Sequence, residues 1–195
     1  MKISKVLFIL FFVVSISGSA QTPTDYLSSE FHKERREILR SKMPKNSVAV
    51  IFANPVRNRA NDVDYIYHQD PNFYYLTGYR EPNAVLLIFS DNQTNTRGEV
   101  YNEIIFVQER NVRYEMWNGK RLGVQGVKSQ LGFEQVFKRK EFINMDFDFQ
   151  KFDNVYVKKI RDDYRDFYAD DADLFNLIQS FKEKSFYNQR RGVSF

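Results

Sequence analysis

Two uninterrupted apolar runs constrain the fold of this chain more than any other feature of its sequence. Residues 47–53 have the sequence SVAVIFA and residues 84–89 have the sequence AVLLIF. Short runs rich in Val, Ile and Leu predict strands buried inside a sheet. A third strand is expected at 103–107, after a turn over 91–98, and this spacing predicts an antiparallel pair. A last strand is expected at 155–157.

Helix signals alternate with these strands. Ser28 or Ser29 is expected to cap a helix that runs to about Met43, where Pro44 follows. Its apolar face is expected to hold Phe31, Ile38 and Leu39. A second helix is predicted from Asp70-Pro71 to Leu76, because Pro is favoured at the first helical position and Gly78 can end the helix. Further helical segments are expected at 109–116, within 124–150, and after Asp171 or Asp173.

Strands that alternate with helices predict an α/β domain with a mixed β-sheet flanked by helices. This domain is expected to occupy residues 29–184, after a polar lead-in at 21–28 and before a loose tail at 185–195. Residues 57–64 are polar and are expected to form an exposed loop. The predicted core strand residues are Val48, Val50, Phe52, Leu86, Ile88, Ile105 and Val107.

The first twenty residues have the pattern of a secretory signal peptide. Lys2 and Lys5 frame the start, an apolar run follows at residues 6–14, and small residues lead to Ala20. We expect cleavage after Ala20 and export to the periplasm or the medium. A membrane anchor is the alternative, but the apolar run is short for a bilayer core of about 30 Å. The chain has no Cys, so a lipoprotein and disulfides are both excluded.

The residue types limit the chemistry of this chain. It has two His residues and no Cys, whereas a zinc site needs three or four ligands. His32 lies in a charged stretch and is expected to be solvated, and His68 is expected to make a structural hydrogen bond. No G-x-S-x-G, G-x-G-x-x-G or P-loop motif occurs. The net charge of +4 falls further without Lys2 and Lys5, which argues against a nucleic-acid partner.

Grouped charges remain as candidates for binding. Three acidic groups are present, at 62 and 64, at 146 and 148, and at 170, 171 and 173. Paired carboxylates can hold a divalent cation, but a solvated loop or a helix N-terminus explains them equally simply. The short basic clusters at 138–140, 158–159 and 190–191 are expected to be solvated surface.

Two longer stretches resemble a known family. Residues 67–89 have the sequence YHQDPNFYYLTGYREPNAVLLIF and residues 115–123 have the sequence EMWNGKRLG. Both resemble motifs of the N-terminal domain of Xaa-Pro aminopeptidases, also called aminopeptidase P, in the creatinase/aminopeptidase P N-terminal family. Arg35-Arg36, Met43-Pro44 and the run VAVIFA also agree. The resemblance covers about residues 29–160.

The resemblance implies a ribonuclease H-like mixed α/β fold for this domain. It also implies a C-terminal "pita-bread" domain in which two Asp, one His and two Glu bind two metal ions, usually manganese. A bridging water there attacks the peptide bond before a penultimate proline. None of these ligands can be carried over to this chain. We expect the chain to lack the catalytic domain, to hold no cofactor and to be inactive alone.

The resemblance also suggests roles for single residues. Asp62 and Trp117 are candidates for contact with a substrate entrance or a neighbouring subunit, although a solvated loop and core packing are the simpler alternatives. Most of the two motifs is expected to be architectural, because Pro82 forces an extended entry into the strand that follows. The motif residues are His68, Gln69, Asp70, Phe73, Tyr75, Thr77, Gly78, Glu81, Pro82, Gly119, Arg121 and Gly123.

The leading hypothesis is therefore a non-catalytic N-terminal domain of an exported Xaa-Pro aminopeptidase. It would assist oligomerisation and shape a substrate entrance, with a second copy or a separately encoded catalytic domain as partner. A stand-alone module that binds peptides or a partner is the alternative, and it should expose an apolar patch. A ribonuclease H-like nuclease that uses Asp62 and Asp64 is a weaker rival, because further carboxylates would have to converge there.

Overall fold

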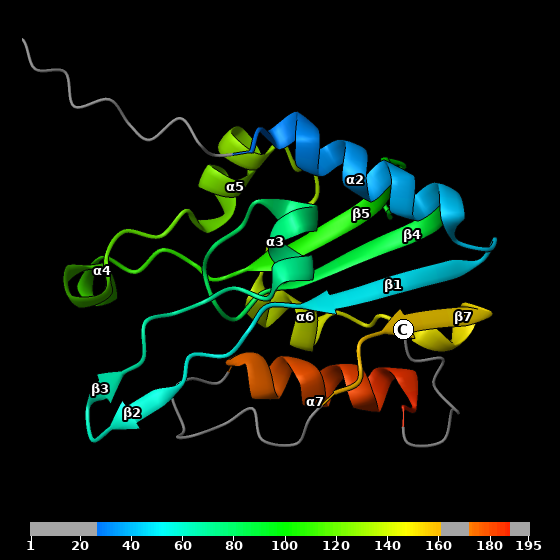
Figure 1. Ribbon diagram of the computed structural model, residues 1–195. Helices are drawn as coiled ribbons and strands as arrows, with labels where there is room; N and C mark the ends of the chain where they lie inside the picture. The colour runs from blue at the N-terminus through cyan, green and yellow to red at the C-terminus, as the bar shows by residue number, and fades with distance from the viewer. Residues whose placement is uncertain (1–26, 161–171, 188–195) are drawn as a thin grey trace, which may run out of the picture.

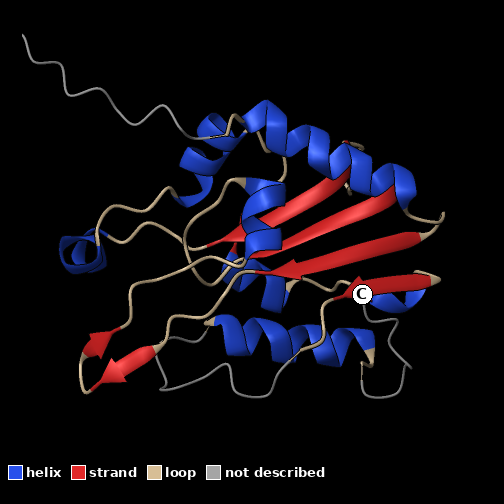
Figure 2. Cartoon of the chain, viewed as in Figure 1, coloured by secondary structure: helices blue, strands red, loops and turns tan. Residues whose placement is uncertain are grey.

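The computed structural model describes residues 27–160 and 172–187. It shows a five-stranded mixed sheet in the order β6-β5-β4-β1-β7, with helices on both faces (Figures 1 and 2). The predicted fold class is therefore confirmed. The proposed signal sequence, most of the lead-in and most of the tail lie outside the described residues.

The strands of the main sheet are β1 (Ser47–Phe52), β4 (Val85–Thr94), β5 (Val100–Val107), β6 (Val136–Lys138) and β7 (Asn154–Val157). β4 pairs antiparallel with both β1 and β5, whereas β7 pairs parallel with β1 and β6 pairs parallel with β5. The antiparallel pair predicted from the sequence is thus confirmed. β4 continues to Thr94, so the turn between β4 and β5 is shorter than expected. β6 was not predicted, because its three residues are too few to show a period.

The helices are α2 (Ser29–Lys42), α3 (Pro71–Thr77), α4 (Val112–Asn118), α5 (Gly123–Leu131), α6 (Arg139–Asn144), the 3₁₀ turn η1 (Phe149–Lys151) and α7 (Leu174–Ser185). Local signals set their ends. The Ser28 side chain accepts from the Phe31 backbone at the start of α2, and Asp173 caps α7 through the Asn176 backbone. α4 begins later than expected, because the Asn111 side chain caps it.

The sheet has a hydrophobic core on each face, because successive strand residues point to opposite sides. Val48, Val50, Val85 and Leu87 pack with α6 and α7, and Leu86 and Ile88 pack with α2, α3 and α5. All the predicted core residues are buried except Phe52, which is only partly buried at the end of β1.

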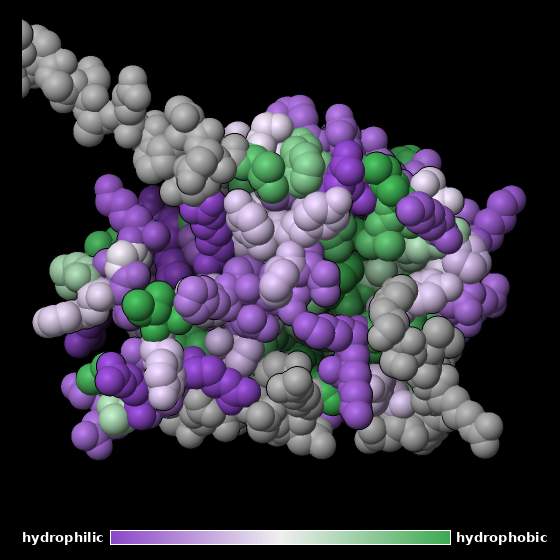
Figure 3. All heavy atoms as spheres, viewed as in Figure 1, coloured by the Kyte–Doolittle hydropathy of each residue, from purple (hydrophilic) through white to green (hydrophobic). Residues whose placement is uncertain are grey.

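The surface of the domain is hollowed beside β1 and β7. An apolar hollow of about 600 Å³ lies there, between α2 and α3 and the strand residues Ala49, Ile51 and Tyr156. Figure 3 shows apolar side chains below α2 on this side of the molecule. Arg35, Lys42 and Lys158 border the hollow.

The segments that follow β1, β5 and β7 all leave the sheet at the same end of its strands. β4 runs opposite to both β1 and β5, and β7 runs parallel to β1, so the carboxyl ends of these three strands coincide. A small hairpin of β2 (Asn58–Ala60) and β3 (Val63–Asp64) follows β1, and α4 follows β5. Both project beyond the sheet on the left of Figure 1. The predicted polar loop at 57–64 is therefore an exposed hairpin.

Candidate functional site

Gln69 joins three segments at the amino end of α3 through both ends of its side-chain amide. Its Oε1 accepts from the Asn54 backbone N–H at 3.0 Å, from the Asp70 N–H at 2.9 Å and from the Tyr67 hydroxyl at 2.9 Å. Its Nε2 donates to the backbone carbonyls of Tyr79 at 3.3 Å and Glu81 at 2.9 Å. The chain after β1, the start of α3 and the entry to β4 are thereby tied together.

Glu81 connects the two family-like motifs. One carboxylate oxygen accepts from the Tyr79 hydroxyl at 2.8 Å, and the other accepts from the Leu122 backbone N–H at 2.7 Å. Burial raises the pKa of the Tyr79 hydroxyl, the nearby Glu81 charge adds to the rise, and Arg121 opposes it. Pro82 is also buried. We call Gln69, Tyr79 and Glu81 with their hydrogen bonds the clasp.

α3 is closed at both ends by side chains of the first motif. Asp70 accepts from the backbone N–H groups of Asn72 and Phe73 and pairs with Lys158 at 2.7 Å. Thr77 donates its hydroxyl to the Phe73 carbonyl and accepts from the Tyr79 N–H. Gly78 ends the helix at φ +70°, where a Cβ would lie 2.8 Å from the ring of His32.

His32 and Arg36 occupy the buried face of α2, which corrects the expectations for His32 and for Ile38. His32 is 1% exposed rather than solvated, and its Nδ1 donates to the Tyr75 carbonyl at 2.8 Å. Arg36 is fully buried, where it binds both carboxylate oxygens of Glu103 at 2.8 and 2.9 Å. Ile38, expected on the apolar face, is instead 42% exposed. The signal that was missed is the spacing of residues 32, 36, 39 and 43, which places two polar residues on the packed stripe.

The two projections carry the candidate contact residues. Asp62 lies exposed in the turn between β2 and β3, and Trp117 lies in the last turn of α4 and is 87% exposed. α4 has no buried residue. Gly119 ends it at φ +79°. The exposed apolar side chains of the two projections are Val63, Tyr65, Ile66, Val112, Tyr114, Met116 and Trp117.

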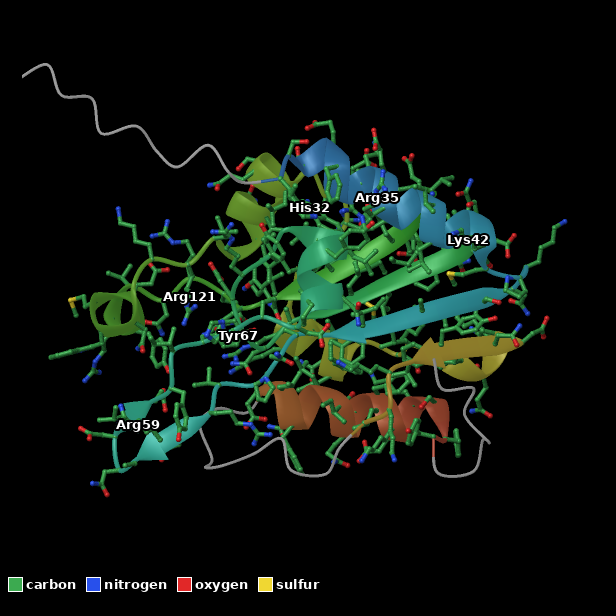
Figure 4. All side chains as sticks on the ribbon, in the orientation of Figure 1. His32, Arg35, Lys42, Arg59, Tyr67 and Arg121 are labelled. Atoms are coloured by element: carbon green, nitrogen blue, oxygen red, sulfur yellow. The ribbon has the colours of Figure 1, made fainter. Side chains whose placement is uncertain are left out.

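A second hollow, of about 740 Å³, lies between the hairpin and the start of α3. His68, Tyr67, Lys158 and Lys159 are among its lining residues, and Figure 4 shows Tyr67 above the hairpin residue Arg59. Burial raises the pKa of the Tyr67 hydroxyl. His68 was expected to make a structural hydrogen bond, and its ring is exposed. The hydrogen bond at this residue is made by its backbone carbonyl, which accepts from Asn54 Nδ2 at 3.1 Å.

The acidic pairs do not form a metal centre within residues 27–160 and 172–187. No three His, Asp or Glu side chains of this part of the chain come close enough together to hold a metal ion. Asp148 caps η1 and Asp173 caps α7. Arg139, expected on a solvated cluster, is 4% exposed and contacts Glu109 at 3.6 Å. The cluster at 190–191 lies outside the described residues.

Comparison with protein families decides the relationship. A model described as "Aminopeptidase P, N-terminal domain" matches residues 32–151. The chain belongs to this family. The matched range contains the clasp, both projections and every strand of the sheet except β7.

Curated relatives extend well beyond the region that matches. An Xaa-Pro aminopeptidase of Haemophilus influenzae is 38% identical over 116 residues, which are 60% of this chain and 26% of that protein. An Xaa-Pro aminopeptidase of Escherichia coli is 33% identical over 110 residues, which are 56% of this chain and 24% of that protein. The chain thus spans about a quarter of the length of these relatives.

A solved structure supports the same relationship for this aminopeptidase P N-terminal domain. Aminopeptidase P of E. coli with the inhibitor Pro-Leu matches with a TM-score of 0.64 and 26% identity, over 87% of this chain and 36% of that chain. In the part of the chain that the structure describes, no helix has the length and apolar character needed to cross a bilayer.

Proposed function

We propose that this chain is the non-catalytic N-terminal domain of an exported Xaa-Pro aminopeptidase. In this proposal a separate catalytic domain supplies the metal ligands and cleaves the bond before proline, and manganese is the metal that the family resemblance implies. This domain contributes to assembly and to the shape of the substrate entrance. The observation that carries the proposal is the exposure of α4, with Trp117 87% exposed at its end.

Few contacts within the domain stabilise α4 as a helix. Helices shorter than about 12–15 residues are marginal in water, and α4 has seven residues, none of them buried. Its local support is the Asn111 cap and the Arg110–Glu115 pair, with N···O distances of 3.0 and 2.9 Å. Exposed aromatic and apolar side chains that gather on one part of a surface favour contact with another protein.

Assembly of the chain after removal of residues 1–20 tests this proposal. We expect light scattering to show an oligomer, or a complex with a catalytic partner domain, and the Trp117→Ala variant to lose it. The matched control is Val100→Ala, which changes an apolar residue that is 58% exposed on β5. Assembly that survives Trp117→Ala would contradict the proposed role of α4, and so would assembly that weakens equally in both variants.

Peptide hydrolysis tests the non-catalytic part. With added manganese, the purified chain should release no N-terminal residue from an X-Pro-X peptide above the rate in buffer. Metal-dependent release that His68→Gln abolishes would overturn this part of the proposal. Mass spectrometry of exported material should find Gln21 at the N-terminus, and an intact Met1 on cytosolic protein would contradict export.

The apolar hollow beside β1 favours a second candidate function, a stand-alone module that binds peptides. Its floor of Ala49, Ile51 and Tyr156 offers apolar contact, and Arg35 and Lys42 on its border offer charge. An X-Pro-X peptide that binds the isolated chain, and no longer binds Ile51→Glu, would favour this module. Binding that Trp117→Ala abolishes would favour the entrance role of α4 instead.

A further inference from the structure

We propose that the chain binds a small oxyanion, a carboxylate or phosphate group of a small molecule, in a basic hollow at the start of α5. The hollow has a volume of about 710 Å³ and lies where the end of α3, the segment after α4 and the start of α5 meet. The residues used below are those of its lining that carry charge: Arg80, Glu81, Arg110, Lys120 and Arg121. This inference is independent of the proposed function.

The carboxylates near the hollow are already engaged within the protein. Glu81 accepts from the Tyr79 hydroxyl and from the Leu122 backbone. Glu115 binds Arg110 with two hydrogen bonds of 3.0 and 2.9 Å. Neither carboxylate therefore neutralises the remaining cations by direct contact, and the positive charge of the lining exceeds its negative charge.

Arg121 and Lys120 are the cations left over. The Nε atom of Arg121 is buried and has no hydrogen-bond partner among the described residues. A buried donor without a partner is costly, so a bound acceptor that reached this atom would relieve that cost. Lys120 is exposed, and within the described ranges it forms no ion pair. Figure 4 shows Arg121 between α4 and the sheet.

The amino end of α5 adds to the positive potential of the hollow. Leu122, Gln125 and Gly126, at the start of this nine-residue helix, line the hollow. The side chain of the N-cap residue Leu122 makes no capping hydrogen bond, and the first turn contains no acidic residue. The Glu81 carboxylate binds the N–H of Leu122 itself, one residue before the helix. A helix N-terminus carries a partial positive charge that favours anions. The helix end and the two side chains thus act on the same space.

The size and the walls of the hollow fit a small ligand. Small-molecule pockets have volumes of about 300–1,000 Å³. The planar guanidinium of an arginine can bind a carboxylate or a phosphate through two parallel hydrogen bonds. Tyr74, Leu122 and Leu131 provide an apolar wall for the rest of such a molecule. Figure 3 shows hydrophilic side chains on this side of the molecule, between α5 and α4.

Calorimetric titration of the full chain tests the inference at constant ionic strength. Inorganic phosphate and succinate are the two probes, and we expect saturable binding of at least one of them; the better probe identifies the anion. Arg121→Met should weaken binding about 10-fold or more, as expected for a lost charge-assisted hydrogen bond. Lys120→Met changes an exposed residue and should weaken binding without any change in fold.

The control is Lys128→Met, an exposed lysine of the same helix that does not line the hollow. Circular dichroism shows whether Arg121→Met still folds, and Lys120→Met decides the matter if it does not. The inference is overturned if neither probe binds, or if Lys128→Met weakens binding as much as Lys120→Met. Binding of an acidic peptide without binding of either small anion would also overturn it.

Discussion

The clasp and α4 are two regions of one domain with opposite surroundings: the side chains of the clasp are hydrogen-bonded within the domain, and those of α4 are exposed to solvent. Every polar group that the clasp brings inside is matched: Gln69 uses both its oxygen and its nitrogen, and Glu81 uses both carboxylate oxygens. α4 instead presents Val112, Met116 and Trp117 to solvent, at 75%, 72% and 87% exposure. The clasp lies in the first of the two stretches that resemble family motifs, and the second stretch begins within α4.

The difference shows that two motifs of one family can differ in where their side chains make contacts. The first motif completes the domain from within, because its partners all belong to this chain. The helix in the second motif leaves its apolar side chains without cover among the described residues. In the proposed function α4 therefore acts through a partner outside the domain, whereas the clasp acts within it.

Replacing a buried aromatic residue of the first motif should have the largest effect. Phe73 is 0% exposed and packs edge-to-face on Tyr79 with ring centroids 6.2 Å apart. Phe73→Ala should lower the free energy of unfolding by about 3–5 kcal/mol, because it leaves a cavity. Urea denaturation of the variant measures this loss. A loss below about 1 kcal/mol would mean that the first motif is not needed for the core.

The clasp itself should show a smaller but clear effect. Gln69→Ala removes five hydrogen bonds and leaves backbone groups of Asn54 and Asp70 without their partner. We expect a loss of about 2–4 kcal/mol in the free energy of unfolding, because unsatisfied buried groups are costly. The control is Gln130→Ala, an exposed residue of α5. Equal effects in the two variants would show that the clasp contributes no more than the surface.

Acid should weaken the side of the domain that holds α2 and α3. Burial lowers the pKa of His32, and the nearby charges of Arg36 and Arg80 lower it further. The unfolded chain therefore binds a proton more readily than the folded chain, so stability is full above about pH 6.5 and falls as the pH drops below it.

Thermal unfolding between pH 7.5 and pH 5 measures this effect. His32→Gln should flatten the dependence of the melting temperature on pH, whereas His68→Gln, which changes an exposed ring, should leave it unchanged. These are the two histidines of the chain. A slope that persists in His32→Gln would refute the assignment.

The smallest expected effect on stability is at α4. Trp117→Ala should change the free energy of unfolding by less than about 0.5 kcal/mol, because exposed sites contribute little. Acrylamide should quench the fluorescence of Trp117 readily in the monomer, and its emission should resemble that of indole in water. Blue-shifted, protected emission from the monomer would mean that Trp117 is covered within the domain, and the comparison of the two regions would fail.

Local signals were enough to predict much of the fold. The apolar runs of β1 and β4, the caps at Ser28 and Asp70, and the stop at Gly78 each act within a few residues of sequence. The exposure of Trp117 could also be anticipated from its place beside a turn. The roles of Trp117 and Asp62 in an assembly stay predictions, because they depend on contacts outside the chain.

The sequence by itself determined the alternation of strands and helices and the membership of the family, because periodicity, caps and motifs are local. Only the tertiary structure decided the partners of buried polar groups. Arg36 meets Glu103 across 67 positions, and Glu81 meets the Leu122 backbone across 41 positions. A periodic pattern shows which face of an element is packed, but the hydrogen bonds that permit a charge to be buried there come from distant segments. For that reason His32 was expected on the surface and no burial was predicted for Arg36, whereas the fold places both inside.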